Sequence, residues 1–301
     1  MRGQRLVLPS LLALAVVYLT KSAAVQDAVH QALTLCARSV VPALFPFLVL
    51  SSLLVSFGFG EWAGRWLGGM MRTLFGLPSA AASALVLGFA AGYPVGAGTA
   101  AELYRKGMMT REESCRLLAF CNNANPVFLV TVLGRGVFAS ARIGMWLWLI
   151  HVAAALITGM LFRSGGETGR KTMAPRPKEA GAGAAGAFVE AVRQSGWNCV
   201  AISAFVTVFY VLSRPFAALG GGLGCLMTGL TELFSLTPLL TPDGAGFVTA
   251  ALCAGFGGIS VLCQTAAVLE GSGLSMRWCV TGKLVQGLIS AILAYIVWQW
   301  V

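Results

Sequence analysis

The sequence predicts an all-α polytopic membrane protein, organised as an inverted repeat with broken or re-entrant helical hairpins. Of its 301 residues, 57% are hydrophobic and only 11% are charged, whereas a soluble domain carries about 25% charged residues. The mean hydropathy is +0.79. Apolar runs of about 20 residues without strict alternation favour helices over barrel strands. Glycine- and proline-interrupted stretches recur in both halves, which indicates broken helices.

The apolar runs give the expected elements. We predict an amphipathic segment at 26–38, irregular glycine-rich regions at 59–104 and 216–268, a polar connection at 105–116, and spans at 6–24, 39–57, 117–134, 141–162, 196–213 and 279–300. The basic, apolar N-terminus is similar to a signal peptide. Because later segments keep crossing the membrane, we expect a retained first helix.

The net charge of +10 is interpreted as a topology signal rather than as a nucleic-acid site. Basic residues at Arg2, Arg5, 105–116 and the 163–190 linker place the N-terminus and the linker in the cytoplasm. Five of them lie at the start of the linker: Arg163, Arg170, Lys171, Arg176 and Lys178. The expected domains are 1–35 (first helix and amphipathic segment), 36–135 (repeat 1), 136–162 (connecting helix), 163–190 (linker) and 191–301 (repeat 2).

Two pairs of short segments suggest the internal repeat. "TLFGLP" at 73–78 is similar to "ELFSLTP" at 232–238, and "ALVLGFAAG" at 84–92 is similar to "ALCAGFGGI" at 251–259. The 39–57 span and its counterpart at 196–213 would cross the membrane in opposite directions. Inverted repeats with interrupted segments are typical of secondary transporters.

The eight cysteines form no C-x-x-C pair, and most lie in apolar runs. There they are expected to act as small hydrophobic residues, so we predict no disulfide, no metal site and no cofactor. His30 and His151 are far apart, and a structural role is the simpler interpretation for each.

"CNNANP" at 121–126 places Asn122, Asn123 and Asn125 directly before Pro126. Amides are costly in hydrocarbon unless they are hydrogen-bonded, and proline lacks a backbone donor. We expect a locally opened helix, with Pro126 freeing a carbonyl near Asn122. The amides either bind substrate or tie helices together.

Other candidates lie close to these amides or in matching positions of the second half. Gly92, Tyr93 and Pro94 would form a turn that lets the backbone approach a ligand. The second half offers Gly257, Gly258, Ser260 and Gln264. Tight helix packing explains the glycines equally well.

Glu232 and Lys283 are ionisable residues in apolar surroundings, which by default suggests function. Glu232 could carry a coupling proton. Lys283 could pair with Glu232 or with an anionic substrate. A structural ion pair is the alternative.

At "LGFAAGYPVGA", "LLAFCNNANPVFLV" and "GFGGISVLCQ" the chain resembles the YlbJ (SpoVV) sporulation integral membrane proteins, within the nucleoside-recognition or Gate-domain group. The resemblance covers about 36–298. It implies two Gate repeats and export of dipicolinic acid from the mother cell towards the forespore, across the outer forespore membrane.

Two alternatives remain open. One is a transporter of nucleosides or other small solutes with the same fold. The other is a non-transporting membrane scaffold in a sporulation complex, with a homo-oligomer or sporulation membrane proteins as partners. An enzyme is not expected, since no nucleophile–base pair, metal cluster or paired carboxylates are found and no P-loop motif occurs.

Overall fold

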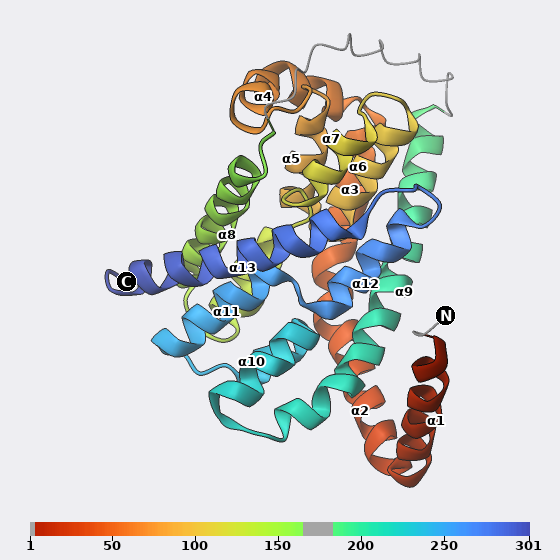
Figure 1. Ribbon diagram of the computed structural model, residues 1–301, viewed down its shortest axis with the longest axis vertical. Helices are drawn as coiled ribbons and strands as arrows, with labels where there is room; N and C mark the ends of the chain where they lie inside the picture. Colours follow the sequence, from red (N-terminus) through yellow and green to blue (C-terminus); the bar gives the residue numbers. More distant parts are fainter. Residues whose placement is uncertain (1–3, 165–182) are drawn as a thin grey trace.

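The computed structural model describes residues 4–164 and 183–301, and the regular elements in these ranges are all helices, with no strand (Figure 1). The all-α class is therefore confirmed. The elements are α1 Gln4–Thr20, α2 Ser22–Leu35, η1 Cys36–Val40, α3 Val41–Ser56, α4 Phe59–Phe75, α5 Ala81–Ala91, α6 Val95–Arg105, α7 Arg111–Leu118, η2 Phe128–Arg135, α8 Ala141–Leu161, α9 Ala184–Ala217, α10 Gly221–Thr231, η3 Phe234–Leu239, α11 Gly244–Phe256, α12 Gly258–Leu269 and α13 Met276–Trp298.

Two long helical rods run side by side in opposite directions. The first joins α2, the π-helical η1 and α3 without a break, and the second is α9, whose 34 residues extend about 50 Å. Cys36, Val40 and Leu44 pack against Ile202 and Val206 between them. The predicted division between an amphipathic segment at 26–38 and a span at 39–57 is wrong, because η1 widens the helix at this point without interrupting it.

The first glycine-rich region forms helices rather than an irregular hairpin. α4 is amphipathic and ends at Gly76, whose φ of 59° closes the helix. α5 and α6 then form a short helical hairpin that turns at Gly92–Pro94. The predicted broken hairpin is thus present, confined to 81–105.

The connection expected at 105–116 contains a helix, α7. Thr110 and Glu113 form a capping box at its start, with Thr110 Oγ1 accepting from the Glu113 backbone at 3.2 Å. α7 ends at Leu118, and residues 122–125 are not helical. The prediction of one span over 117–134 is therefore wrong. A non-helical segment, residues 119–125, separates α7 from the next helix. We call it the asparagine segment.

The second half contains a similar interruption. The region expected to be irregular at 216–268 holds α10, the 3₁₀ helix η3, α11 and α12. α11 and α12 meet at Gly257, whose φ of 89° ends one helix before the other begins. α13 packs along α11 and α8 and crosses the middle of the molecule (Figure 1).

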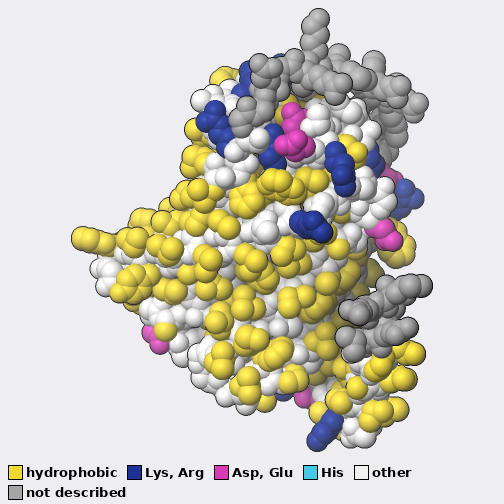
Figure 2. All heavy atoms as spheres, viewed as in Figure 1, with side chains coloured by type: hydrophobic (Ala, Val, Ile, Leu, Met, Phe, Trp, Pro, Cys, Tyr) yellow, Lys and Arg dark blue, Asp and Glu magenta, His cyan; other side chains and the backbone are white. Residues whose placement is uncertain are grey.

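Five helices of the described ranges are long and apolar enough to cross a membrane: Ser22–Leu54, Ala141–Leu161, Ala184–Ala217, Gly244–Leu269 and Met276–Trp298. Hydrophobic side chains cover the middle and lower part of the face seen in Figure 2, and basic side chains gather near its upper end. Residues 165–182 of the predicted linker lie outside the described residues. α9 begins at Ala184, within the predicted linker.

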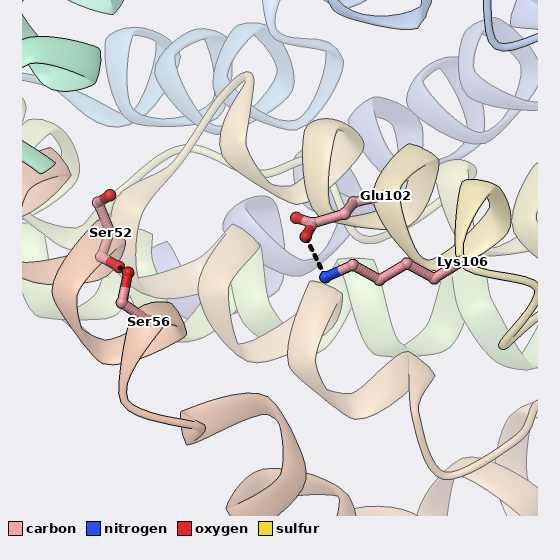
Figure 3. A network of polar contacts seen from close by, with 4 residues as sticks. All are labelled: Ser52, Ser56, Glu102 and Lys106. Carbon is pink, nitrogen blue, oxygen red and sulfur yellow. Dashed lines mark hydrogen bonds and ion pairs between the residues drawn. The ribbon is translucent and has the colours of Figure 1, made fainter. Parts of the chain in front are cut away.

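Two ion pairs lie at exposed positions of the described residues, Lys106–Glu102 and Arg193–Glu190. Glu102 and Lys106 form an ion pair one turn apart at the end of α6 (Figure 3). In the same view, Ser56 of α3 donates from Oγ to the Ser52 carbonyl at 2.9 Å. Exposed pairs of this kind contribute little to stability.

Candidate functional site

The asparagine segment is enclosed by helices α5, α6 and α13. A Cβ added to Gly88 of α5 or to Gly96 of α6 would lie 1.7 or 2.0 Å from the Cys121 carbonyl oxygen. On the other side, a Cβ at Gly282 of α13 would lie 2.2 Å from the Ala119 carbonyl oxygen. Glycine at these three positions lets backbone pass directly over backbone. The α5–α6 hairpin and α13 therefore hold the segment between them.

The three asparagines of this segment are buried and hydrogen-bonded. Asn122 Nδ2 donates to Thr265 Oγ1 of α12 at 2.8 Å. Asn123 Nδ2 donates to the Phe120 carbonyl at 2.8 Å. Asn123 Oδ1 also accepts from Gln286 Nε2 of α13 at 2.9 Å. These amides connect the asparagine segment to both α12 and α13.

Asn125 and Pro126 act at the start of the helix that leads into η2 rather than within a helix. Helical residues begin at Pro126, two positions before η2. The Phe128 backbone donates to Asn125 Oδ1 at 2.8 Å, so Asn125 caps this helical start. Pro126 follows at the first helical position, where proline is well tolerated. The expectation that Pro126 frees a carbonyl of a preceding turn is therefore wrong, because the helix begins at this proline.

The glycine interruption faces the asparagine segment through Tyr93. Gly257 and Gly258 have φ of 89° and 84°. A Cβ at Gly257 would lie 3.5 Å from Tyr93 Cε1. The Tyr93 hydroxyl donates to the Ala254 carbonyl at 3.1 Å. On the other side of the same turn, a Cβ at Gly92 would lie 3.0 Å from Asn125 Cβ. The Gly92–Pro94 turn, with its cis Tyr93–Pro94 bond, thus contacts both interruptions.

A small cavity of about 30 Å³ lies where these segments meet the two long rods. This is far below the roughly 300–1,000 Å³ of pockets that hold small molecules, so the cavity as it stands is too small for a ring-sized solute. The lining is mainly apolar and aromatic with three polar side chains, and consists of Leu44, Tyr93, Asn125, Phe128, Ile202, Glu232, Leu233, Phe234, Val261 and Gln264.

Glu232 is the charged residue of the cavity wall and is only 2% exposed. It lies between α10 and η3, where Glu232 Oε2 accepts from the Ser235 backbone at 2.6 Å and from Ser235 Oγ at 2.9 Å. Backbone and hydroxyl donors of η3 thus stabilise the carboxylate within the fold.

On the α12 side of the cavity, Gln264 Nε2 donates to Ser260 Oγ at 3.3 Å, and Ser260 is fully buried. Gln264 also lines the cavity, whereas Ser260 stands one helical turn behind it and supports its amide. At 3.3 Å this hydrogen bond is longer than the usual range of about 2.7–3.2 Å, so it is weak.

Lys283 does not line this cavity and does not pair with Glu232; no ion pair joins them in the part of the chain that the structure describes. Its ammonium donates to Gln286 Oε1 at 2.9 Å and lies 5.6 Å from the centre of the Tyr93 ring. Lys283 therefore approaches Tyr93 from α13, while Glu232 lines the cavity that Tyr93 also borders.

The fold brings most of the predicted site residues together. Tyr93, Asn125, Glu232 and Gln264 line the cavity. The others support or surround it: Gly92, Pro94, Asn122, Asn123, Gly257, Gly258, Ser260 and Lys283. Which of them contact a substrate stays a prediction.

Sequence reasoning missed Gln286, which links Lys283 to Asn123, and Thr265. A polar residue three positions after Lys283 within an apolar span was the available signal for Gln286. His151 was interpreted as structural; its Nε2 accepts from the Ala124 backbone at 3.1 Å.

Comparison with known proteins gives two findings on sequence. Residues 37–162 match the family described as "Gate: Nucleoside recognition". The chain is 28% identical to the sporulation integral membrane protein YlbJ of Bacillus subtilis (strain 168), over 86% of this chain and 74% of that protein. The residues matched to the family, 37–162, include the turn at Gly92–Pro94 and the asparagine segment.

Two solved structures share the fold. The chain aligns over its whole length with 88% of a doubly substituted CNTnw in an outward-facing state, at a TM-score of 0.58 and 12% identity. It also aligns over 85% of its length with 74% of CNTnw in an inward-facing substrate-bound state, at a TM-score of 0.54 and 14% identity. These likenesses confirm the transporter-like fold.

The protein is thus an integral membrane protein with a transporter-like fold. Its predicted resemblance to the YlbJ sporulation integral membrane proteins and to the Gate group is confirmed.

Proposed function

We propose that this protein transports a small organic anion, with dipicolinate as the first substrate to test. The observation that carries the proposal is the cavity at which the Gly92–Pro94 turn, both helix interruptions and the two long rods meet. Secondary transporters bind substrates at such meetings of discontinuous helices. A substrate in this cavity would contact elements from both halves of the chain. A movement of one half against the other would therefore expose the substrate to the opposite side of the membrane.

Aromatic side chains in the cavity wall suit a flat ring. Tyr93, Phe128 and Phe234 surround the cavity, and the Phe128 and Phe234 rings lie 4.7 Å apart, edge to face. The amides of Asn125 and Gln264 supply donors and acceptors. Since the cavity is only about 30 Å³, these walls would have to separate for substrate to enter. The CNTnw structures in outward-facing and inward-facing states support a fold that makes such a movement.

Glu232 makes the protonation state important for an anionic substrate. Two like charges about 4 Å apart repel by about 4 kcal/mol at an effective dielectric constant of about 20. A carboxylate substrate would therefore bind when Glu232 carries a proton, which couples anion movement to proton movement.

A second candidate, a nucleoside or similar uncharged solute, is favoured by the same residue. An ionised Glu232 accepts hydrogen bonds from hydroxyl or amide donors of a neutral molecule without any need for a proton. The match of 37–162 to a nucleoside-recognition family supports this alternative.

The remaining assignments follow from the proposal. Transport needs no bond-making, so the protein would not be an enzyme. Basic loops would place the N-terminus and the linker in the cytoplasm. The similarity to YlbJ supports a role in the outer forespore membrane of a sporulating cell. Inversion of the two halves, the predicted domain limits and an association with copies of itself or with sporulation proteins remain parts of this proposal.

Uptake of labelled dipicolinate into proteoliposomes tests the proposal. We expect uptake by the wild type and a loss of at least about tenfold in Gln264→Leu, equivalent to about 1.4 kcal/mol for one lost polar contact. Gln194→Leu is the matched control, because Gln194 is exposed on α9. Equal uptake by both variants would place the substrate elsewhere.

Competition with unlabelled uridine or adenosine separates the two candidates. Dipicolinate uptake that resists competition supports the anion. Nucleoside uptake without dipicolinate uptake supports the alternative. A folded protein that moves neither solute, yet co-purifies with sporulation membrane proteins, would support the scaffold interpretation.

A further inference from the structure

Lys283 is a buried cation without a carboxylate partner among the described residues, and the proposed transport site does not explain why it is there. Its side chain is 0% exposed, near the start of α13. The described residues form ion pairs only at exposed positions, Lys106–Glu102 and Arg193–Glu190. Burying an ammonium without a carboxylate is costly unless other groups replace its hydration. The groups that replace the hydration of the Lys283 ammonium therefore indicate which kind of ion this position binds.

Oxygen atoms and a ring face surround the ammonium. Lys283 Nζ donates to Gln286 Oε1 at 2.9 Å and lies 3.5 Å from the Gly255 carbonyl oxygen. The Tyr93 ring centre is 5.6 Å away, within the range of a cation–π contact. Gly255 belongs to the last turn of α11, where carbonyls lack helical partners and carry partial negative charge.

The ammonium also connects the two helix interruptions. Gly255 lies two residues before the glycine interruption at Gly257. Gln286 passes the connection on, because its Nε2 donates to Asn123 Oδ1 at 2.9 Å in the asparagine segment. A single positive charge therefore joins both interruptions through α13.

Carbonyls at the C-terminal ends of broken helices coordinate the coupling cation in secondary transporters. Here the corresponding oxygen of α11 faces a side-chain ammonium instead. We infer that Lys283 is a tethered cation, which occupies a monovalent-cation site between the two interruptions and makes a free sodium ion unnecessary there. This inference rests on the proposed transport function.

The other titratable groups near Lys283 do not supply a counter-charge. They are His151 on α8, Cys121 in the asparagine segment, Cys279 on α13 and Tyr93 in the hairpin turn. Each of these side chains is mainly uncharged at neutral pH. The positive charge is thus held by dipoles and a ring face, as a bound monovalent cation would be.

The test uses thermal unfolding of the full-length purified protein, which requires no substrate. Wild type should have the same midpoint in sodium chloride and in choline chloride. Lys283→Ala removes the part of the side chain that n-propylammonium reproduces. Its midpoint should be lower than that of the wild type, and n-propylammonium chloride should raise it by about 2–4 °C, whereas choline chloride should not.

Lys283→Met controls for volume, because it fills the space without a charge. It should have a lowered midpoint that n-propylammonium does not change. A wild-type midpoint raised specifically by sodium would overturn the inference, and this comparison holds even if Lys283→Ala does not fold. So would a Lys283→Met protein as stable as the wild type, or a folded Lys283→Ala protein indifferent to the amine.

Uptake measurements keep this inference separate from the proposed function. If neither dipicolinate nor nucleosides are transported but the amine stabilises Lys283→Ala, the cation site stands and the substrate assignment fails. If the wild type takes up dipicolinate only with a sodium gradient, the transport proposal stands and the tethered cation fails.

Discussion

The two helix interruptions differ in how their backbone is satisfied. Between α7 and η2, residues 122–125 have no regular structure, and three asparagine side chains bond to backbone or to other helices. Between α11 and α12, two glycines change direction within two residues, with φ near 90°. Each interruption precedes a long unbroken helix, α8 or α13. One interruption is thus held by side chains and the other by backbone conformation.

The difference indicates a division of roles. The asparagine segment is enclosed on both sides by glycines of α5, α6 and α13, so its position is fixed by close backbone contacts. The glycine interruption leaves the α11 carbonyls for Tyr93 and Lys283. We therefore expect changes around the first interruption to affect folding most, and changes around the second to affect transport with a smaller loss of stability.

The largest effect is expected from substitutions that place a side chain between the asparagine segment and the helices that enclose it. Gly88→Ala or Gly96→Ala places a Cβ within 2.0 Å of the Cys121 carbonyl oxygen, and backbone atoms on both sides leave little room to adjust. We expect destabilisation of at least about 3 kcal/mol or failure to fold. Fluorescence-detected size exclusion and thermal unfolding measure the loss.

Gly69→Ala is the matched control for this prediction. A Cβ at Gly69 in α4 meets nothing within 4 Å, and alanine is the better helix former by about 1 kcal/mol. Its midpoint should equal or exceed that of the wild type. Normal folding of Gly88→Ala would mean that the segment is not enclosed as described.

The next largest effect is expected from Glu232→Gln, which should change the pH dependence of uptake rather than stability. If protonation admits the anion, wild-type uptake of dipicolinate should rise from mildly alkaline to mildly acidic pH. Glu232→Gln should lose most of that dependence, because the amide is neutral throughout. Glu190→Gln, at an exposed ion pair with Arg193, should keep it. An unchanged pH profile in Glu232→Gln would remove the proton from the mechanism.

A third change isolates backbone conformation at the second interruption. Gly257→Ala meets only ordinary contacts, with Val261 Cγ1 at 3.4 Å and Tyr93 Cε1 at 3.5 Å, yet it must keep φ at 89°. The expected cost is therefore about 1–2 kcal/mol, from strain alone. Thermal unfolding measures it, and a loss as large as that of Gly88→Ala would contradict the proposed division of roles.

Much of this arrangement could be predicted from local sequence, and the errors have identifiable causes. The apolar runs predicted α8, α13 and the glycine-rich interruptions. α7 was missed although Thr110 and Glu113 form a readable capping pattern. Pro126 was interpreted as a break rather than as a first helical residue. The bonds Asn122–Thr265 and Asn123–Gln286 join residues more than 140 positions apart, and no local periodicity indicates such pairs.

The smallest effect separates the two functions that Asn125 combines. Asn125 caps the helical start at Pro126 through Oδ1 and also lines the cavity. Asn125→Ala should cost about 1 kcal/mol by removing the cap and should reduce uptake. Asn125→Ser keeps a capping oxygen but shortens the side chain, so stability should be nearly unchanged while uptake still falls. Thermal unfolding and proteoliposome uptake on both variants decide the matter: if Asn125→Ser transports normally, the asparagine serves only the helix, and the polar contacts to substrate come from the α12 side of the cavity.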